Sequence, residues 1–478
     1  MKKYLVYMLA AVCLMGTYSC DDQLDVNEDP LAATSADPNS VIPFILTSYE
    51  ARKQTELGTR ILDVSQHLSA CFNSPRQGVT TSFLTGNTWG MYYTLMLGNL
   101  VLLEADARAA GEAQNNVAAL AVILKALAFY EMSVIYEDIP FTQALNGQEF
   151  PFPEFDSQET VLKGTVDLLD EAVSLIAQVP SDGAFGIGAS DFIYNGNMDL
   201  WERYANSLQL RILMIIRNVD AGYADSRIQA VLGRPLLETL DHVASFPFFT
   251  DPGAQNAFAD LNETFFGTPS NEAVQVYGPG PVLLSLLVDN DDPRTDVFMA
   301  DLSGTGDFPG PDMGVFPTAV ETVISDDVIR FDWPAVWYTP AEVDLYRAEL
   351  VLEGVISGDA DALTQSGVRK ALQYYGQEID GASATISDGD IDAFVSTFTN
   401  VDLETVYEQQ YLEAFMRPLV SWNHVRRNRW PELDLVPGAS ISDFLQRFSY
   451  PPDEIGANPN TPPQKADNSV TMWAFPAN

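Results

Sequence analysis

Residues 115–140 read NNVAALAVILKALAFYEMSVIYEDIP. Between Val117 and Val134 apolar side chains recur at spacings of three and four, which predicts a long helix with an apolar face. Asn115 or Asn116 is expected to cap its N-terminus, and the EDIP segment is expected to end it. Several alanines keep the side chains small, so that a neighbouring helix can approach closely. The chain is therefore expected to contain a buried, mainly α-helical core.

Further segments on both sides of this stretch carry the same helical pattern. Thr339-Pro340-Ala341-Glu342 is a capping box with proline at the first helical position, which predicts a helix start. Helices of about 15–20 residues in pairs are typical of helical-hairpin arrays, although no clean repeat of about 34 residues is visible. The predicted segments are 158–178, 198–219, the helix opened by Pro340, 365–375, 403–415 and, after a break at Pro418, 419–428.

Composition divides the chain into a helical scaffold and less regular parts. Residues 220–337 are rich in Gly, Pro, Asp and aromatic residues, which predicts a loop-rich lobe with a few short strands. Loops of this size inside an ordered protein usually carry function. The expected organisation is a tether over 20–40 and a single domain over 41–478, with its scaffold over 41–219 and 338–430, the lobe over 220–337 and a Pro- and Asn-rich C-terminal belt over 431–478.

The first twenty residues predict export. Lys2 and Lys3 precede an apolar run over 5–15, which is too short for a bilayer span of about 20 residues. The run leads to Cys20, and a cysteine after a small residue at this place resembles a bacterial lipobox. Residues 1–19 are therefore expected to be a lipoprotein signal peptide, with Cys20 as the lipidated first residue. The alternative is an ordinary cleaved signal with a chance cysteine.

The charge balance excludes two classes of partner. The chain has 66 Asp and Glu against 25 Lys and Arg, a net charge of −41 at pH 7. Such a chain repels phosphate backbones, so nucleic-acid binding is not expected. It also gains nothing electrostatically from an anionic lipid surface. Attachment to a membrane is expected to depend on acyl chains.

Catalytic and metal-binding patterns are mostly missing. His67, His242 and His424 are far apart and have no second ligand at zinc spacing, and there is no Gly-x-Ser-x-Gly elbow. The run from Asp388 begins like a calcium loop but lacks the Gly and Glu of an EF-hand, so we interpret it as an acidic helix start. Pairs of carboxylates of the kind that glycosidases use occur by chance in so acidic a chain, so they indicate no catalytic site unless their geometry is known. No catalytic residue, metal or cofactor is predicted, and a structural calcium ion, for example within 289–292, is left open.

Aromatic residues in loops are the best candidates for binding. Sugar rings stack their apolar C–H faces on aromatic side chains, and peptide ligands use the same rings as hydrophobic pockets. The alternative for each is a core or loop-anchoring aromatic. The candidates are Phe72, Phe83 and Trp89 before the first long helix, and Phe265, Phe266, Tyr277, Trp333 and Trp337 in the irregular region.

Arg211 and the pair Arg426-Arg427 stand out in an acidic chain. Their positions within helical segments favour a structural role. They are expected to neutralise buried carboxylates or to bind helix ends rather than to contact a ligand.

Motifs along the whole chain resemble those of one known family. The tether LDVNEDP (24–30) is similar to its Leu-Asp-x-Asn-x-Asp-Pro start, and EDIPF (137–141) resembles its Gly-Asp-Val-Pro-Tyr turn. Together with the further matches given next, and in the same order along the chain, these motifs identify the chain as similar to the SusD/RagB family of outer-membrane nutrient-binding lipoproteins. The remaining matches are Trp201 with ANSLQLR (205–211), DDPR (291–294), the helix from Glu342 to Glu349, the block over 407–431, RFSYP (447–451) and Trp473.

The resemblance implies a mainly α-helical fold in which four tetratricopeptide-like helix pairs carry an irregular lobe. It also implies a surface-exposed protein, lipid-anchored in the outer membrane, that acts as a lid over a SusC-like TonB-dependent transporter. Such a protein captures a glycan, or in some members a peptide, and delivers it without chemistry. The matching motifs are structural, so the aromatic candidates do not follow from them. Two rivals remain, a glycan-degrading surface lipoprotein enzyme and an adhesive helical-repeat protein without a transport role.

Overall fold

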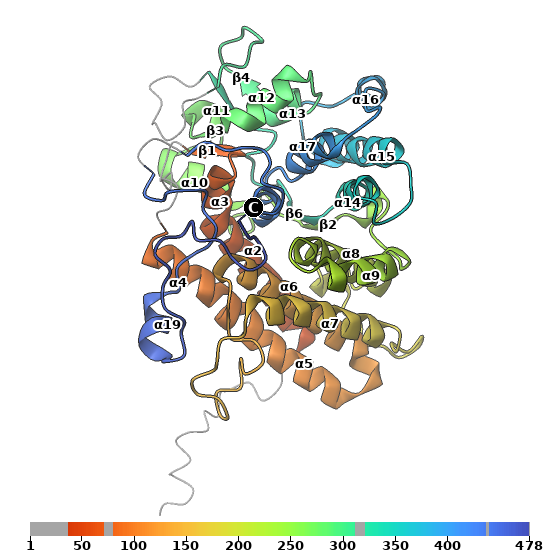
Figure 1. Ribbon diagram of the computed structural model, residues 1–478, viewed down its shortest axis with the longest axis vertical. Coiled ribbons are helices and arrows are strands. Elements are labelled where there is room, and N and C mark those ends of the chain that lie inside the picture. The colour runs from red at the N-terminus through yellow and green to blue at the C-terminus, as the bar shows by residue number, and fades with distance from the viewer. Residues whose placement is uncertain (1–36, 71–79, 311–320, 436–438, 478) are drawn as a thin grey trace, which may run out of the picture. The chain divides into compact units, whose positions relative to one another are not determined.

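The computed structural model describes residues 37–70, 80–310, 321–435 and 439–477. Cys20, the tether before residue 37 and Phe72 lie outside them. Within the described residues the fold is mainly α-helical and built from packed helix pairs, as expected (Figure 1). The scaffold helices are α2 (Pro38–Lys53), α3 (Thr59–Val64), α4 (Ser82–Gly90), α5 (Gly98–Ala110), α6 (Asn115–Tyr136), α7 (Gln158–Ile176), α8 (Met198–Arg217), α9 (Ala221–Leu232), α14 (Pro340–Leu352), α15 (Ala360–Gln373), α16 (Asp388–Val395), α17 (Leu403–Glu413), α18 (Pro418–Asn428) and α19 (Pro452–Ala457).

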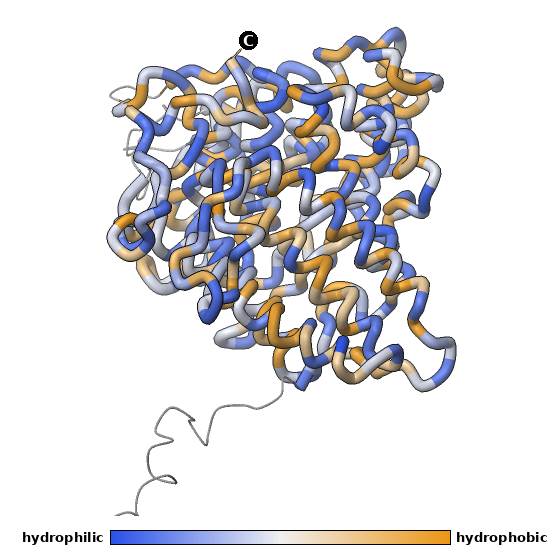
Figure 2. The backbone as a smooth tube through the Cα atoms, turned by 60° about the horizontal axis from the view of Figure 1, so that its bottom comes forward, coloured by the Kyte–Doolittle hydropathy of each residue, from blue (hydrophilic) through white to orange (hydrophobic). Residues whose placement is uncertain are grey.

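The scaffold helices pack on one another in chain order. α5 packs on α6, α6 on α7, α7 on α8 and α8 on α9, while α14 packs on α15 and α17. In Figure 1 these helices form successive layers, from α5 near the bottom to α15 and α17 at the upper right. Hydropathy alternates every few residues along the helices (Figure 2), which gives each a face to bury against the next.

Helix α6 is the helix expected over 115–140, and its end at Tyr136 agrees with that prediction. The expected cap is wrong, because the helix begins at Asn115 without a side-chain cap, and Asn116 instead donates to the Phe185 carbonyl at 2.7 Å. Among the described residues, only the stretch Glu112–Tyr136 is long and apolar enough to cross a membrane. Its most apolar window is 94% buried inside the protein, as in a core helix.

Helix α18 and the C-terminal belt together close the end of α6. Arg426 Nη1 donates to the Val134 carbonyl at 2.7 Å, and Arg447 Nη2 donates to the Tyr136 carbonyl at 2.7 Å. Carbonyls in the last turn of a helix have no partner within the helix. Two arginines from the C-terminal part of the chain therefore supply hydrogen bonds that α6 cannot make itself, which confirms the helix-end role expected for Arg426.

Buried ion pairs join the later helices to α8. Arg211 Nε lies 2.6 Å from Glu342 Oε1, and Arg417 Nη1 lies 2.8 Å from Glu342 Oε2. Arg427 pairs with Glu349. The expectation that Arg211 and Arg427 neutralise buried carboxylates is confirmed.

The remaining elements are short helices and three two-stranded antiparallel pairs, β1–β3, β2–β6 and β4–β5. In Figure 1 most of them lie at the top and upper left, and β2–β6 lies near the centre beside α14. Within the range expected to be loop-rich, Asp220 caps α9, which packs on the scaffold helix α8. The pair β2–β6 ends next to α14, so it connects the irregular region to the scaffold. The elements are α10 (Ala257–Phe266), α11 (Asn271–Val274), α12 (Pro281–Asp289), α13 (Thr295–Phe298), β1 (Leu68–Ala70), β2 (Ala244–Phe246), β3 (Tyr277–Pro279), β4 (Met299–Asp301), β5 (Thr322–Ile324) and β6 (Ala335–Tyr338).

Candidate functional site

Trp89 lies in an aromatic cluster. The ring is 9% exposed and lies 4.9 Å from Tyr93, 6.2 Å from Phe155 and 6.2 Å from Tyr450, measured between ring centroids. These partners come from a helical turn, a loop and the C-terminal belt. In this position Trp89 anchors the belt to the scaffold.

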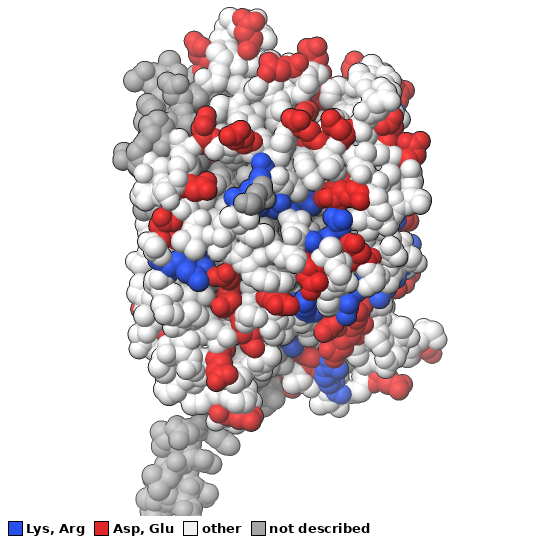
Figure 3. All heavy atoms as spheres, viewed as in Figure 1, with Lys and Arg blue, Asp and Glu red and all other residues white. Residues whose placement is uncertain are grey.

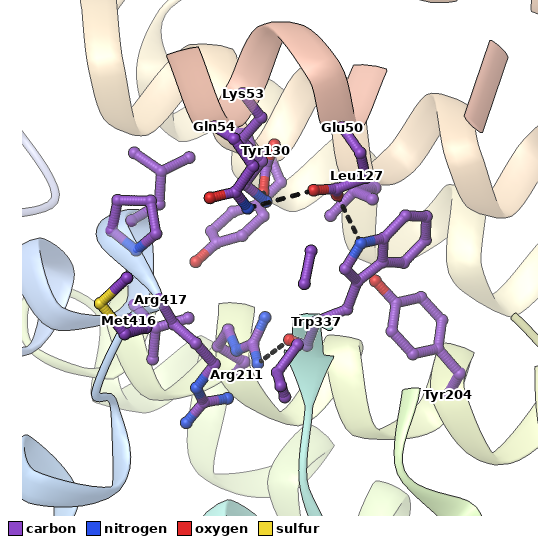
Figure 4. Close-up of a pocket in the computed structure, with 16 residues that line it drawn as sticks. Glu50, Lys53, Gln54, Leu127, Tyr130, Tyr204, Arg211, Trp337, Met416 and Arg417 are labelled. Carbon is purple, nitrogen blue, oxygen red and sulfur yellow. Dashed lines mark hydrogen bonds and ion pairs between the residues drawn. The ribbon is translucent and has the colours of Figure 1, made fainter. Parts of the chain in front are cut away.

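Trp337 of β6 is also buried, beside a small cavity (Figure 4). Its indole Nε1 donates to Glu50 of α2 at 2.6 Å, and its carbonyl accepts from Arg211 at 2.8 Å. Figure 4 shows Arg211 and Arg417 across the space from Glu50. Burial raises the pKa of the Glu50 carboxyl to about 6. The cavity volume is about 20 Å³, which admits about one water molecule and no sugar ring.

Tyr277 and Trp333 are each 3% exposed. The Tyr277 ring packs edge-on against Phe258 at 5.6 Å, and Trp333 stacks on Tyr375 at 6.4 Å with an interplanar angle of 9°. Tyr277 thus packs within the irregular region, and Trp333 joins that region to the scaffold beside the end of α15.

Three of the candidates are exposed. Phe83 on α4 is 67% exposed, and Phe265 and Phe266 at the end of α10 are 57% and 40% exposed. Both helices pack on the same π-helical turn, Gln54–Gly58. We use the name aromatic patch for these three exposed side chains, one on α4 and two on α10. A ligand could reach these rings without a change of fold.

Two open cavities are large enough for a small ligand, with volumes of about 430 Å³ and about 470 Å³. The first is lined by residues of the C-terminal belt, including Arg429 and Phe444. The second lies between α12 and α17 and is lined by residues that include Phe394 and Glu408. These lining residues could not be predicted, because the walls of each cavity come from segments that are separated in the chain. The acidic run at 289–292 was the only signal near the second cavity.

The described residues contain no group of three or more His, Cys, Asp or Glu that could hold a metal ion. Asp292, in the run considered for calcium, accepts three hydrogen bonds from Arg294, one from its backbone N–H and two from its guanidinium group. Asp388 and Asp390 lie in the first turn of α16, where negative charge is favourable, and Ser387 caps that helix. The acidic run from Asp388 is thus a helix start.

Comparison with known proteins gives a family and a fold. A family model for SusD-like proteins, described as "Starch-binding associating with outer membrane", matches residues 41–451. No curated protein sequence matches the chain significantly.

Solved structures of similar fold cover almost the whole chain. A Bacteroidetes SusD-like protein has a TM-score of 0.77 at 20% identity and covers 92% of this chain and 100% of its own. A chitin-binding SusD homologue from Flavobacterium johnsoniae has a TM-score of 0.74 at 18% identity, covering 92% and 99%. A SusD-like protein from Bacteroides thetaiotaomicron has a TM-score of 0.71 at 18% identity, covering 92% and 99%. The chain belongs to the SusD-like family, a family of non-catalytic, outer-membrane-associated binding proteins.

Proposed function

We propose that this protein is a surface-exposed lipoprotein that captures a glycan and delivers it to a SusC-like TonB-dependent transporter in the outer membrane. The observation that carries the proposal is the family match over residues 41–451, which spans both the scaffold and the irregular region. The family description names starch binding and the outer membrane. A similar structure is that of a chitin-binding protein, which supports a glycan rather than another nutrient.

The aromatic patch is the proposed first contact for the glycan. Phe83, Phe265 and Phe266 present apolar ring surface of the kind on which sugar C–H faces stack. Replacing all three by Ala should weaken glycan binding by about tenfold or more. Binding would be measured across a panel of soluble glycans and peptides, with Phe44→Ala on α2, 48% exposed, as the control. If the wild-type protein binds peptides and no glycan, the ligand is a peptide instead. If the triple variant binds glycan with the affinity of the wild type, the aromatic patch is not the contact site.

The proposed anchor is the acylated Cys20, which lies outside the described residues. The acidic chain gains nothing from anionic lipid, so the acyl chains are the proposed means of attachment. Cys20→Ala should move the protein from the membrane fraction to the soluble fraction. Equal membrane retention of the variant and the wild type would contradict the anchor.

The proposed partner is tested by purification from the native outer membrane in mild detergent. The wild-type protein should bring a large TonB-dependent barrel with it. If the purified protein still binds glycan but no barrel accompanies it, the result would favour the adhesive alternative.

A further inference from the structure

The cavity between α12 and α17 has features that the proposed function does not use. Its volume is about 470 Å³. One wall is the loop after α12, with Asp289 and Asp291, and the other is the segment that joins α16 to α17. Phe394 and Phe398 line it as an edge-to-face pair with ring centroids 5.4 Å apart. It is thus a space of ligand size with an aromatic wall.

The charge of this cavity has one sign. Asp289, Asp291 and Glu408 line it, and its lining contains no Lys, Arg or His. Figure 3 shows Asp and Glu without Lys or Arg around α12 and α13 at the top of the view. An uncharged or cationic ligand is therefore favoured over an anionic one.

Glu408 lines the cavity without an ion-pair partner among the described residues. Its Oε1 accepts a hydrogen bond from Asn290 Nδ2 at 2.9 Å. Burial raises the pKa of Glu408 to about 7, with Asp292 adding to the rise and Arg294 opposing it. Arg294 itself is bound by Asp292. A positive group in the cavity would restore the charged form of Glu408.

We propose that this cavity binds an amino sugar, with the protonated amino group against Glu408 and a sugar face on Phe394. The proposal rests on the proposed function and names a substrate class for it. An ammonium group matches a single carboxylate beside an aromatic face. A divalent cation would need several converging oxygen ligands, and the described residues contain no group of three acidic, His or Cys side chains that could hold one. Asn400 and Thr405, which also line the cavity, can bind hydroxyl groups.

The test measures calorimetric affinity at pH 7 for the glucosamine disaccharide and for its N-acetylated counterpart. Acetylation removes the positive charge, so the free amine should bind about tenfold more tightly. Glu408→Gln should abolish that difference. Glu404→Gln is the matched control, because Glu404 is an exposed residue one turn away on the same helix and does not line the cavity. Phe394→Ala should weaken both ligands.

Equal affinity for the two disaccharides, or a tenfold preference that survives in Glu408→Gln, would overturn the assignment. Equal or tighter binding of Nα-acetyl-lysine amide would overturn the choice of a sugar. The proposed function is judged separately, because Glu408→Gln should still co-purify with a TonB-dependent barrel and bind neutral glycans. Loss of the barrel from the wild-type protein would contradict the proposed function instead.

Discussion

At the scale of single residues, Glu50 illustrates the cost of burying a carboxylate. It is fully buried and accepts hydrogen bonds from Trp337 Nε1 at 2.6 Å and Gln54 Nε2 at 3.3 Å. Burial raises its pKa from 4.5 to about 6, in spite of these bonds and of Lys53. The folded state therefore binds a proton more tightly than the unfolded state, so this residue's contribution to stability falls as the pH rises from about 4.5 through about 6.

Glu50→Gln should remove that dependence, because the amide is neutral at every pH and still offers an oxygen to Trp337. Relative to the variant, the wild type should lose about 2 kcal/mol of unfolding free energy between pH 4.5 and pH 7. Urea unfolding of both proteins at several pH values measures it. If the difference in unfolding free energy between the wild type and Glu50→Gln stays constant across this pH range, the raised pKa of Glu50 would be contradicted.

Gly280, directly after β3, is a residue at which a side chain has no room. A Cβ placed there would lie 1.8 Å from the carbonyl oxygen of Gln66, which is backbone and cannot move aside cheaply. Gly280→Ala should therefore lower the unfolding free energy by about 3 kcal/mol or more. The control is Gly86→Ala in α4, where a Cβ meets nothing within 4 Å and a gain of about 0.5–1 kcal/mol is expected. If urea unfolding gives the two variants similar stability, the pair β1–β3 must shift to make room for the added Cβ at position 280.

The sequence indicated which residues were aromatic and near loops, but not which of them the fold would bury. Trp89 is covered by Phe155 and Tyr450, Trp333 by Tyr375, and Trp337 meets Glu50. These partners are far away in the chain, and a single sequence carries no signal for such pairs. Exposure of the aromatic patch could not be predicted for the same reason.

At the scale of helices, the predictions succeeded where the signal was local. α7, α8 and α17 begin where their patterns begin, and Asn197 and Asp402 accept hydrogen bonds from backbone N–H groups of the first turns of α8 and α17. The helix expected over 365–375 instead begins at Ala360, because Asp359 caps it. Periodicity and capping depend on residues within one turn, so a sequence can show them.

The start of α14 contains a residue, Glu342, whose backbone contact is local but whose side chain binds distant segments. Thr339 accepts a hydrogen bond from the Glu342 N–H at 3.3 Å, as a capping box requires. The Glu342 carboxylate does not return to Thr339 but binds Arg211 of α8 and Arg417. Burial alone would raise the pKa of Glu342, but the positive charges and hydrogen bonds of Arg211 and Arg417 outweigh burial and lower it. The same side chain that marks a helix start in the sequence therefore ties that helix to two distant segments.

Glu342→Gln should lower the unfolding free energy by about 3 kcal/mol, because it leaves the buried guanidinium of Arg211 without its carboxylate, while Arg417 keeps Glu413. Glu159→Gln is the control, since Glu159 is 47% exposed and shares Lys163 with Asp220, so its loss should cost less than about 1 kcal/mol. Chemical unfolding of both variants measures the difference. Equal costs would indicate that the three-residue network adds little beyond a surface pair.

At the scale of the whole molecule, the net charge of −41 opposes the compact state through self-repulsion. Salt screens repulsion between exposed charges over about 10 Å at 0.1 M, whereas the buried pairs of Arg211 and Arg427 are screened much less. Raising NaCl from about 0.02 M to about 0.3 M should therefore raise Tm by about 2–4 °C. The same ionic strength of KCl controls for ion-specific effects. A fall in Tm would mean that screened surface pairs outweigh the net repulsion.

The closure of α6 by Arg426 and Arg447 has a consequence for the order of folding. The Arg426–Val134 hydrogen bond joins residues 292 positions apart, and Arg447 and Tyr136 are 311 apart. The central helix of the first third of the chain thus keeps unsatisfied carbonyls until the last tenth has been synthesised. Because contacts between residues so distant in sequence form slowly, α6 should gain these two hydrogen bonds late in folding, after the helix pairs around it have packed.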